Sequence, residues 1–218
     1  MSSVSADSPG KKPYHHGALH SALIEASIAL AREGGPDRVI LREAARAAGV
    51  SHSAAYRHFT HREALLAEVA RFARHELAAE MRRRVNRTKD PRRRLRAVGT
   101  AYIDFALAEP GLFRTAFTSH PAASLGTEDE PATSGNDLAD TTGWEDPYEV
   151  LSQVLDEAQT AGVLDPRRRP GAEIGAWSAV HGLAGLLLDG PLPTNPAGVK
   201  FSREQVLDLI ERGLLNGA

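Results

Sequence analysis

The stretch Val39–Arg62, VILREAARAAGVSHSAAYRHFTHR, constrains the fold of this chain more than any other segment. It predicts two short helices, over about 41–48 and 52–59, joined by a tight turn at Gly49. Such a turn needs a residue that tolerates positive φ, which glycine does. The crossing of the two helices needs a small side chain, and Ala45 supplies it. The segment therefore predicts a helix-turn-helix.

The second helix of this motif places polar side chains opposite Val50 and Ala55, which we expect to face inward. Ser51 and Ser53 are natural caps for its N-terminus. Hydroxyl, imidazole and guanidinium groups suit contacts with base edges and phosphates, so this helix is a candidate for reading a DNA groove. The groove-facing candidates are Ser51, His52, Ser53, Ala54, Tyr56, Arg57 and His58.

Charge is divided unevenly along the chain. Residues 1–100 contain 19 Lys and Arg against 10 Asp and Glu, whereas residues 101–218 contain 7 against 18. This asymmetry indicates that only the first half meets a polyanion, which could be DNA, RNA or a membrane surface. We interpret Arg82–Arg84 and Arg92–Arg94 as a solvated basic face, with a second DNA site as the alternative.

The rest of the chain favours an all-α fold. Hydrophobic residues make up 42% of it, helix formers dominate and strand signals are scarce. We expect a disordered arm over 1–13, a helix-turn-helix domain over 14–61 and a helical effector-binding and dimerisation domain over 62–218, with a mobile loop at 119–146. Apolar periodicity places helices at about 18–32, from 62, from 91, at 148–162, at 172–188 and at 203–215. Pro110 and Gly111 are expected to break the helix that begins at 91, before a short Leu112-Phe113 segment.

Several classes of protein are not favoured by this sequence. There is no Cys, no apolar run long enough to cross a bilayer and no signal-peptide segment, so we expect a cytoplasmic protein. His15, His16 and His20 suggest a metal site, but no nearby carboxylate or Cys completes a ligand set. No nucleophile elbow or phosphate-binding loop is present, so we expect neither a cofactor nor an enzyme.

The run from Ala18 to Val69 resembles the tetracycline-repressor (TetR) family of regulators, most specifically at Tyr56-Arg57-His58-Phe59 and at Arg62-Glu63-Ala64-Leu65-Leu66. The resemblance implies a three-helix DNA-binding domain followed by a helical domain that dimerises and binds an effector. The DNA contacts that it implies are Ser51, His52, Ser53, Tyr56 and His58.

Two positions depart from the family pattern. Arg62 stands where Lys is usual, and it is still expected to meet a phosphate. Ile40 and Leu41 stand where Thr is frequent, and Arg42 is a candidate to replace that phosphate contact. Lys11 and Lys12 either enter the minor groove as a flexible arm or belong to a solvated tail.

The C-terminal half resembles the Trp-His-Gly subgroup of the same family, at Ala176–Gly182 and at Glu109–Arg114. This resemblance supports a ligand-binding, dimer-forming half. Trp177 and His181 lie four residues apart on one helix face, either as pocket residues or as ordinary core residues. The candidate effector-binding residues are Tyr102, Phe105, Phe113, Phe117, Tyr148, Trp177 and His181.

The last two predicted helices carry apolar stripes that are too rich for a solvated surface. They fit a four-helix interface to which each subunit contributes two helices. The candidate dimer-interface residues are Ile174, Leu183, Leu187, Val206, Ile210 and Leu214.

These observations together predict a homodimeric regulator of transcription. Two recognition helices related by a two-fold axis would bind a palindromic operator in double-stranded DNA. We expect a repressor that a small, mostly apolar ligand releases. The alternatives are an architectural DNA-binding protein, an enzyme that uses His181 or the N-terminal histidines, and a protein-interaction module.

Overall fold

The structure is a computed structural model that describes residues 15–118 and 144–217. Within these ranges the regular structure is helical, apart from one isolated bridge between Leu164 and Leu215. The all-α prediction is therefore confirmed. The predicted arm over 1–13 and residues 119–143 of the predicted loop lie outside the described residues. No described helix has the length and apolar character needed to span a membrane.

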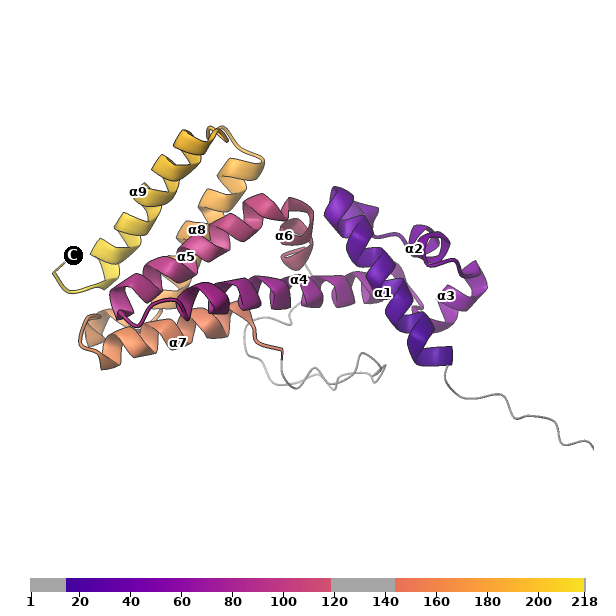
Figure 1. The fold of residues 1–218 in the computed structure, drawn as a ribbon, viewed down its shortest axis with the longest axis horizontal. Coiled ribbons are helices and arrows are strands. Elements are labelled where there is room, and N and C mark those ends of the chain that lie inside the picture. Colours follow the sequence, from indigo (N-terminus) through magenta and orange to yellow (C-terminus); the bar gives the residue numbers. More distant parts are fainter. Residues whose placement is uncertain (1–14, 119–143, 218) are drawn as a thin grey trace, which may run out of the picture.

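A three-helix cluster forms one end of the molecule (Figure 1). Its apolar residues, among them Leu23 and Val39, belong to the same continuous core as the rest of the chain. Its first helix begins three residues before the predicted start at Ala18. The elements of this cluster are α1 (His15–Gly34), η1 (Pro36–Arg38), α2 (Leu41–Ala47) and α3 (His52–His58).

Helix α4 (Arg62–Val85) runs from this cluster along the whole C-terminal half (Figure 1). Its 24 residues alternate between buried positions such as Leu65 and Leu77 and a surface rich in arginine. One continuous helix therefore belongs to both ends of the molecule.

The next three helices begin at prolines, as the sequence predicts for Pro91; Pro110, expected only to break the helix before it, begins a helix as well. Asp90 caps the first of them by accepting a hydrogen bond from the backbone N–H of Arg92 at 3.0 Å. The three helices are α5 (Pro91–Ala108), α6 (Pro110–Ala116) and α7 (Pro147–Thr160), and the short η3 (Pro166–Arg168) follows.

Two long helices, α8 (Ala172–Leu188) and α9 (Pro196–Leu214), end the fold at the far side from α1–α3 (Figure 1). The bounds of α8 are those predicted, but α9 begins seven residues before the predicted start at Arg203. The difference arises because Pro196 takes the first helical position and Asn195 caps it, accepting from the N–H of Gly198 at 2.9 Å.

Helix α6 joins the two ends of the molecule. A Cβ on Gly111 would lie 2.1 Å from the carbonyl oxygen of Ala31 in α1, so the two backbones approach as closely as glycine permits. Beside this contact, Arg32 and Glu109 form an ion pair at 3.3 Å. The α1–α3 cluster is therefore packed directly against the C-terminal half through α6.

Candidate nucleic-acid interface and C-terminal cavity

The turn between α2 and α3 has the geometry that the sequence predicts. Gly49 has a φ of +69°, a region that favours glycine. The N–H of Val50 donates to the carbonyl of Ala45 at 2.9 Å and closes the turn. Ala45 is buried where the two helices cross. The predicted helix-turn-helix is confirmed.

Helix α3 is held by its inner face and leaves its outer face open. Ala55 and Phe59 are buried against the core. The hydroxyl of Ser51 accepts a hydrogen bond from the N–H of Ala54 at 3.2 Å and caps the helix. Of the groove-facing candidates, those exposed are Ser51, His52, Ser53, Tyr56 and Arg57.

Tyr56 is 46% exposed, so it is not a core aromatic. The edge of its ring packs against His52, one turn earlier, with a centroid distance of 4.6 Å. His58 is half-buried, and its ring centroid lies 6.0 Å from that of His20 on α1. A DNA contact from each of these side chains stays a prediction.

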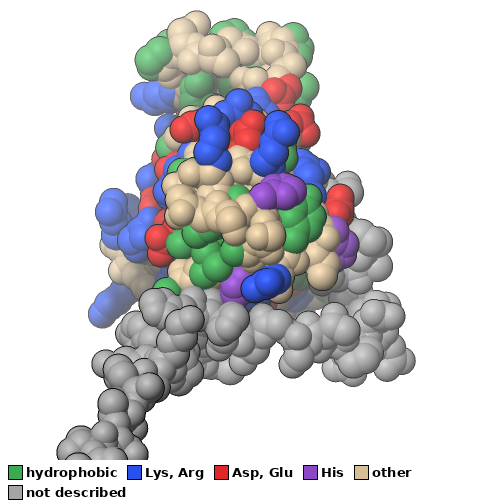
Figure 2. Space-filling view, turned by 90° about the vertical axis from the view of Figure 1, so that its right-hand side faces the viewer, with side chains coloured by type: hydrophobic (Ala, Val, Ile, Leu, Met, Phe, Trp, Pro, Cys, Tyr) green, Lys and Arg blue, Asp and Glu red, His purple; other side chains and the backbone are tan. Residues whose placement is uncertain are grey.

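Three arginines on this motif are exposed, and no described residue forms an ion pair or side-chain hydrogen bond with them: Arg42, Arg46 and Arg57. Figure 2 shows this end of the molecule, where Lys and Arg side chains lie among acidic, histidine, polar and apolar ones. Arg46 was not predicted from the sequence, although its spacing of four residues from Arg42 places both on one face of α2. These three cations, which have no counter-ion among residues 15–118 and 144–217, are available for phosphate.

The side chain of Arg62 is less free than the resemblance implies. Its Nε donates to the carbonyl of Val39 at 2.8 Å and its Nη2 donates to the carbonyl of Pro36. Arg62 therefore ties the start of α4 to η1, and its phosphate contact stays a prediction that depends on its remaining N–H groups. At the start of α2, Ile40 is exposed and offers no side-chain cap.

The N-terminal candidates are only partly described. Lys11 and Lys12 lie outside the described residues. The ring of His20 stacks on Phe59 at a centroid distance of 4.8 Å, which is a packing role. Across residues 15–118 and 144–217, no three His, Cys, Asp or Glu side chains come together as a metal site.

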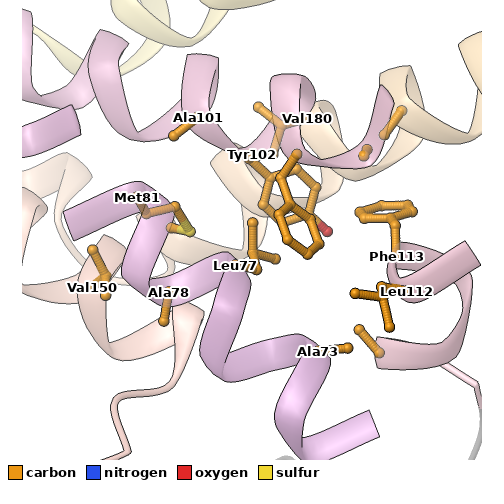
Figure 3. Packing of buried hydrophobic residues seen from close by; sticks show 14 of the residues in the cluster. Ala73, Leu77, Ala78, Met81, Ala101, Tyr102, Leu112, Phe113, Val150 and Val180 are labelled. Carbon is orange, nitrogen blue, oxygen red and sulfur yellow. The ribbon is translucent and has the colours of Figure 1, made fainter. Parts of the chain in front are cut away.

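A hydrogen-bonded pair lies at the centre of the C-terminal half. The hydroxyl of Tyr102 on α5 lies 2.7 Å from Nδ1 of His181 on α8. Tyr102 is 1% exposed, and burial raises its pKa while burial lowers the pKa of His181. Both groups are therefore neutral at pH 7, and the hydroxyl can donate to the ring nitrogen. Figure 3 shows the Tyr102 ring close to Phe113 and Leu77.

Most predicted effector residues gather around this pair. Trp177 is half-buried and its ring centroid lies 5.1 Å from that of Tyr102. Tyr148 reaches only the edge of the group, 6.0 Å from Trp177, and Phe105 is buried outside these ring contacts. The rings brought together, called the aromatic cluster below, are Tyr102, Phe113, Phe117, Trp177 and His181.

A small cavity of about 20 Å³ lies between α5, α8 and α9, and Met81 of α4 and Leu151 of α7 complete its lining. Tyr102 and Trp177 of the aromatic cluster line it, whereas the other predicted effector residues do not. The rest of its wall is apolar except for Arg96 and Glu211. A volume of this size holds about one water molecule. Any larger ligand must therefore move part of the wall.

Arg96 ties α5 to α9 at the edge of this cavity. Its Nη1 donates to Asp208 at 2.9 Å and to Glu211 at 3.0 Å, and its Nη2 donates to Glu204. Burial lowers the pKa of the Arg96 guanidinium, but these three hydrogen bonds outweigh it and raise the pKa overall. The role of Arg96 was not predicted from the sequence, because its partners lie more than a hundred residues away.

The predicted dimer stripe is only partly exposed in the protomer, so its role as an interface stays a prediction. Leu183, Leu187 and Ile210 are buried within the protomer, packed against its own core. Val206 and Leu214 are only half-buried, and of the predicted residues Ile174 alone is strongly exposed. The large apolar side chains that α8 and α9 do leave exposed are Ile174, Leu186, Phe201 and Leu209.

Two family models match the chain. The model of the bacterial regulatory proteins of the tetR family matches residues 23–69, which include the helix-turn-helix. The model of the tetracyclin repressor-like C-terminal domain matches residues 95–210. No curated protein matches the chain at a significant level.

Solved structures share the fold over nearly the whole chain. A protein of unknown function from Rhodococcus sp. RHA1 is 28% identical, with a TM-score of 0.68 and coverage of 94% of this chain and 100% of that one. The TetR family transcriptional regulator PfmR from Thermus thermophilus is 24% identical, with a TM-score of 0.57 and coverage of 88% and 97%. A TetR family regulator from Marinobacter aquaeolei is 18% identical, with a TM-score of 0.59 and coverage of 91% and 96%.

Proposed function

The chain belongs to the tetR family of bacterial regulatory proteins, and from that premise we propose that it is a dimeric repressor that a ligand releases from a palindromic operator. As a member of this family it is a DNA-binding regulator of transcription. We assign it no catalytic activity and place its work in the cytoplasm, where the chromosome of a bacterium lies.

The outer face of α3 and its flanking arginines carry the proposal. Tyr56, His52 and Ser53 offer a phenol, an imidazole and a hydroxyl on one exposed surface. Such groups discriminate base edges in the major groove. Arg42 and Arg46 on α2 stand beside them without counter-ions among the described residues and suit the phosphates on either side.

Dimerisation is supported by the apolar face of α8 and α9. Ile174 is 66% exposed, and Phe201 and Leu209 are each 67% exposed. A Cβ added to Gly182 or Gly185 on α8 would meet nothing within 4 Å, so a second copy could approach closely there. Two helices from each subunit would then form a four-helix bundle. The two recognition helices would lie about 34–36 Å apart, in successive major grooves.

A route from the cavity to the DNA surface supports release by a ligand. Tyr102 lines the cavity, and its ring lies 5.6 Å from that of Phe113 on α6. Gly111 on the same helix is in close contact with Ala31 of α1. A ligand that moves Tyr102 would shift α6 and, through it, the α1–α3 cluster. DNA and ligand would then weaken each other's binding by the same factor.

Selection of bound fragments from the source genome at physiological salt tests the proposal. A sequence-specific regulator enriches one or a few palindromes upstream of genes. Diffuse enrichment would favour an architectural protein instead. Once an operator is known, transcription with and without the protein gives the sign of regulation, and activation would contradict the repressor assignment.

A further inference from the structure

The cavity between α5, α8 and α9 has an apolar wall that contains one ion pair, Arg96 with Glu211. The geometry points to an effector of a particular charge: an apolar body that carries one ammonium group, with the body in the cavity and the ammonium on Glu211. This inference rests on the proposed effector role of the C-terminal half and names the class of ligand.

Glu211 is the partner that Arg96 can release. The guanidinium of Arg96 also binds Asp208 and Glu204, so it keeps two carboxylates when Glu211 turns away. Leaving a buried charge unpaired is costly, but this exchange leaves none. An incoming ammonium group replaces the guanidinium at Glu211 while Arg96 stays paired.

An anionic ligand is disfavoured at the same site. To reach Arg96 it must displace carboxylates that are already bound, and it is repelled by those that stay. Three carboxylates surround the single guanidinium of Arg96, and a further cation, Arg212, lies 3.7 Å from Asp208. The edge of the cavity therefore carries excess negative charge, which selects against a carboxylate or phosphate ligand.

Two aromatic rings also lie in the cavity wall. Tyr102 and Trp177 both line the cavity, with their centroids 5.1 Å apart and their planes at 72°. An ammonium group within about 6 Å of such a ring is attracted by the negative face of its π system. The remaining wall, which includes Met81, Leu95 and Val180, is suited to an apolar body.

The size of the cavity indicates how the ligand acts. At about 20 Å³ the cavity has room for about one water molecule, so a larger occupant must displace the flexible side chain of Met81 or the half-buried Trp177. Exchange at Glu211 removes one of the three bonds by which Arg96 holds α9 to α5. Since α9 also carries Phe201 and Leu209, loosening it would alter the proposed dimer surface.

Three probes of one skeleton test the charge preference: 4-phenylbutylamine, 4-phenylbutanoate and 4-phenylbutanol. The chain has two tryptophans, so Trp144→Phe leaves Trp177 as the only indole reporter in the cavity wall. Fluorescence titration of this full-length variant should show the amine binding at least about tenfold more tightly than the carboxylate. Equal or tighter binding of the carboxylate would overturn the inference.

Two variants test whether the ammonium group of the ligand binds Glu211. Glu211→Gln should weaken the amine at least about tenfold and the neutral alcohol less than about threefold, which also shows that the cavity is still folded. Glu204→Gln is the matched control, because Glu204 binds Arg96 without lining the cavity. The amine should bind this variant with the same affinity as it binds the parent protein. Equal losses in both variants would assign a structural role to the carboxylates and overturn the inference.

The experiments distinguish a failure of this inference from a failure of the proposed function. If only the alcohol or the carboxylate binds, the cavity is still supported as the effector site, but the inference that the ligand is a cation is wrong. If no probe changes the Trp177 emission, the cavity does not take a ligand of this kind. In either case the binding of the ligand-free protein to genomic fragments is measured independently and tests the DNA-binding role.

Discussion

The molecule has two exposed surfaces of different chemical character. One is the outer surface of α2 and α3, and the other is the outer surface of α8 and α9. On the first, Arg42, Arg46 and Arg57 have no counter-ion among the described residues. On the second, the arginines of α9 are paired: Arg203 holds Asp104 at 2.7 Å and Arg212 lies 3.7 Å from Asp208, while Arg96 of α5 holds three carboxylates of α9. Beside exposed polar side chains such as Lys200, this surface exposes the large apolar side chains Ile174, Leu186, Phe201 and Leu209.

This difference indicates which kind of partner each surface meets. Cations that are not neutralised within the protein can release counter-ions from DNA, whereas paired cations fix the geometry of helices. Large apolar side chains without cover mark a protein interface. The basic first half and acidic second half of the sequence reflect the same division of roles.

The largest effect is expected from charge placed on α8 and α9. Leu209 is 67% exposed, so Leu209→Glu should keep the thermal transition and abolish the dimer in analytical ultracentrifugation. Leu187 is 2% exposed, so Leu187→Glu should instead cost about 4 kcal/mol or more of unfolding free energy, because it buries an unpaired charge. A folded monomeric Leu187→Glu variant would show that the interface lies on the buried stripe.

Removal of the free cations on the other surface should have the next largest effect. The triple variant of Arg42, Arg46 and Arg57 to Ala should weaken DNA binding about 100-fold and reduce the slope of the salt dependence by about one unit for each phosphate that is no longer bound. Arg93→Ala is the control, since Arg93 is 79% exposed but belongs to the C-terminal half. Fluorescence anisotropy over a salt series measures both, and equal losses would contradict the assignment of the two surfaces.

Tyr56→Ala should weaken DNA binding less than the triple arginine variant does, and it should also reduce the discrimination between DNA sequences. Loss of a groove-facing side chain should weaken operator binding about tenfold and bring the affinities of the operator and a mutated site closer together. The dimer should persist. If the affinities for both sites fall by the same factor, Tyr56 contacts the backbone and does not read bases.

The smallest effect concerns the pH dependence of stability in the C-terminal half. Burial lowers the pKa of His181 below its ordinary 6.5, so the unfolded chain binds the proton first as the pH falls. Stability should therefore decrease as the pH falls through 6.5, and His181→Gln should make this decrease shallower. Thermal unfolding at pH values on either side of that point compares the two proteins, and identical slopes would contradict the burial of a neutral His181.

Local signals in the sequence were sufficient for much of the fold and for the helix-turn-helix. Gly49 and Ala45 act on their immediate neighbours, so the turn could be predicted from spacing alone. The start of α9 was missed because a proline can end a linker or begin a helix, and only the Asn195 cap decides which.

Long-range packing could not be predicted in the same way. Helix α8 is apolar on several sides, so periodicity did not tell Leu183, which is buried within the protomer, from Leu186, which is exposed. Whether an arginine is paired could not be predicted either. Among the described residues Arg46 has no counter-ion and Arg96 has three, and only the positions of carboxylates far along the chain distinguish the two.

A footprint of the protein on its selected operator is the most direct test of the two-surface account. We expect two protected half-sites on one face of the DNA, about 34–36 Å apart, with both lost in the monomeric Leu209→Glu variant at concentrations that saturate the parent. A single asymmetric site that Leu209→Glu protects as well as the parent would contradict the account, because α8 and α9 would then play no part in placing α3 on DNA.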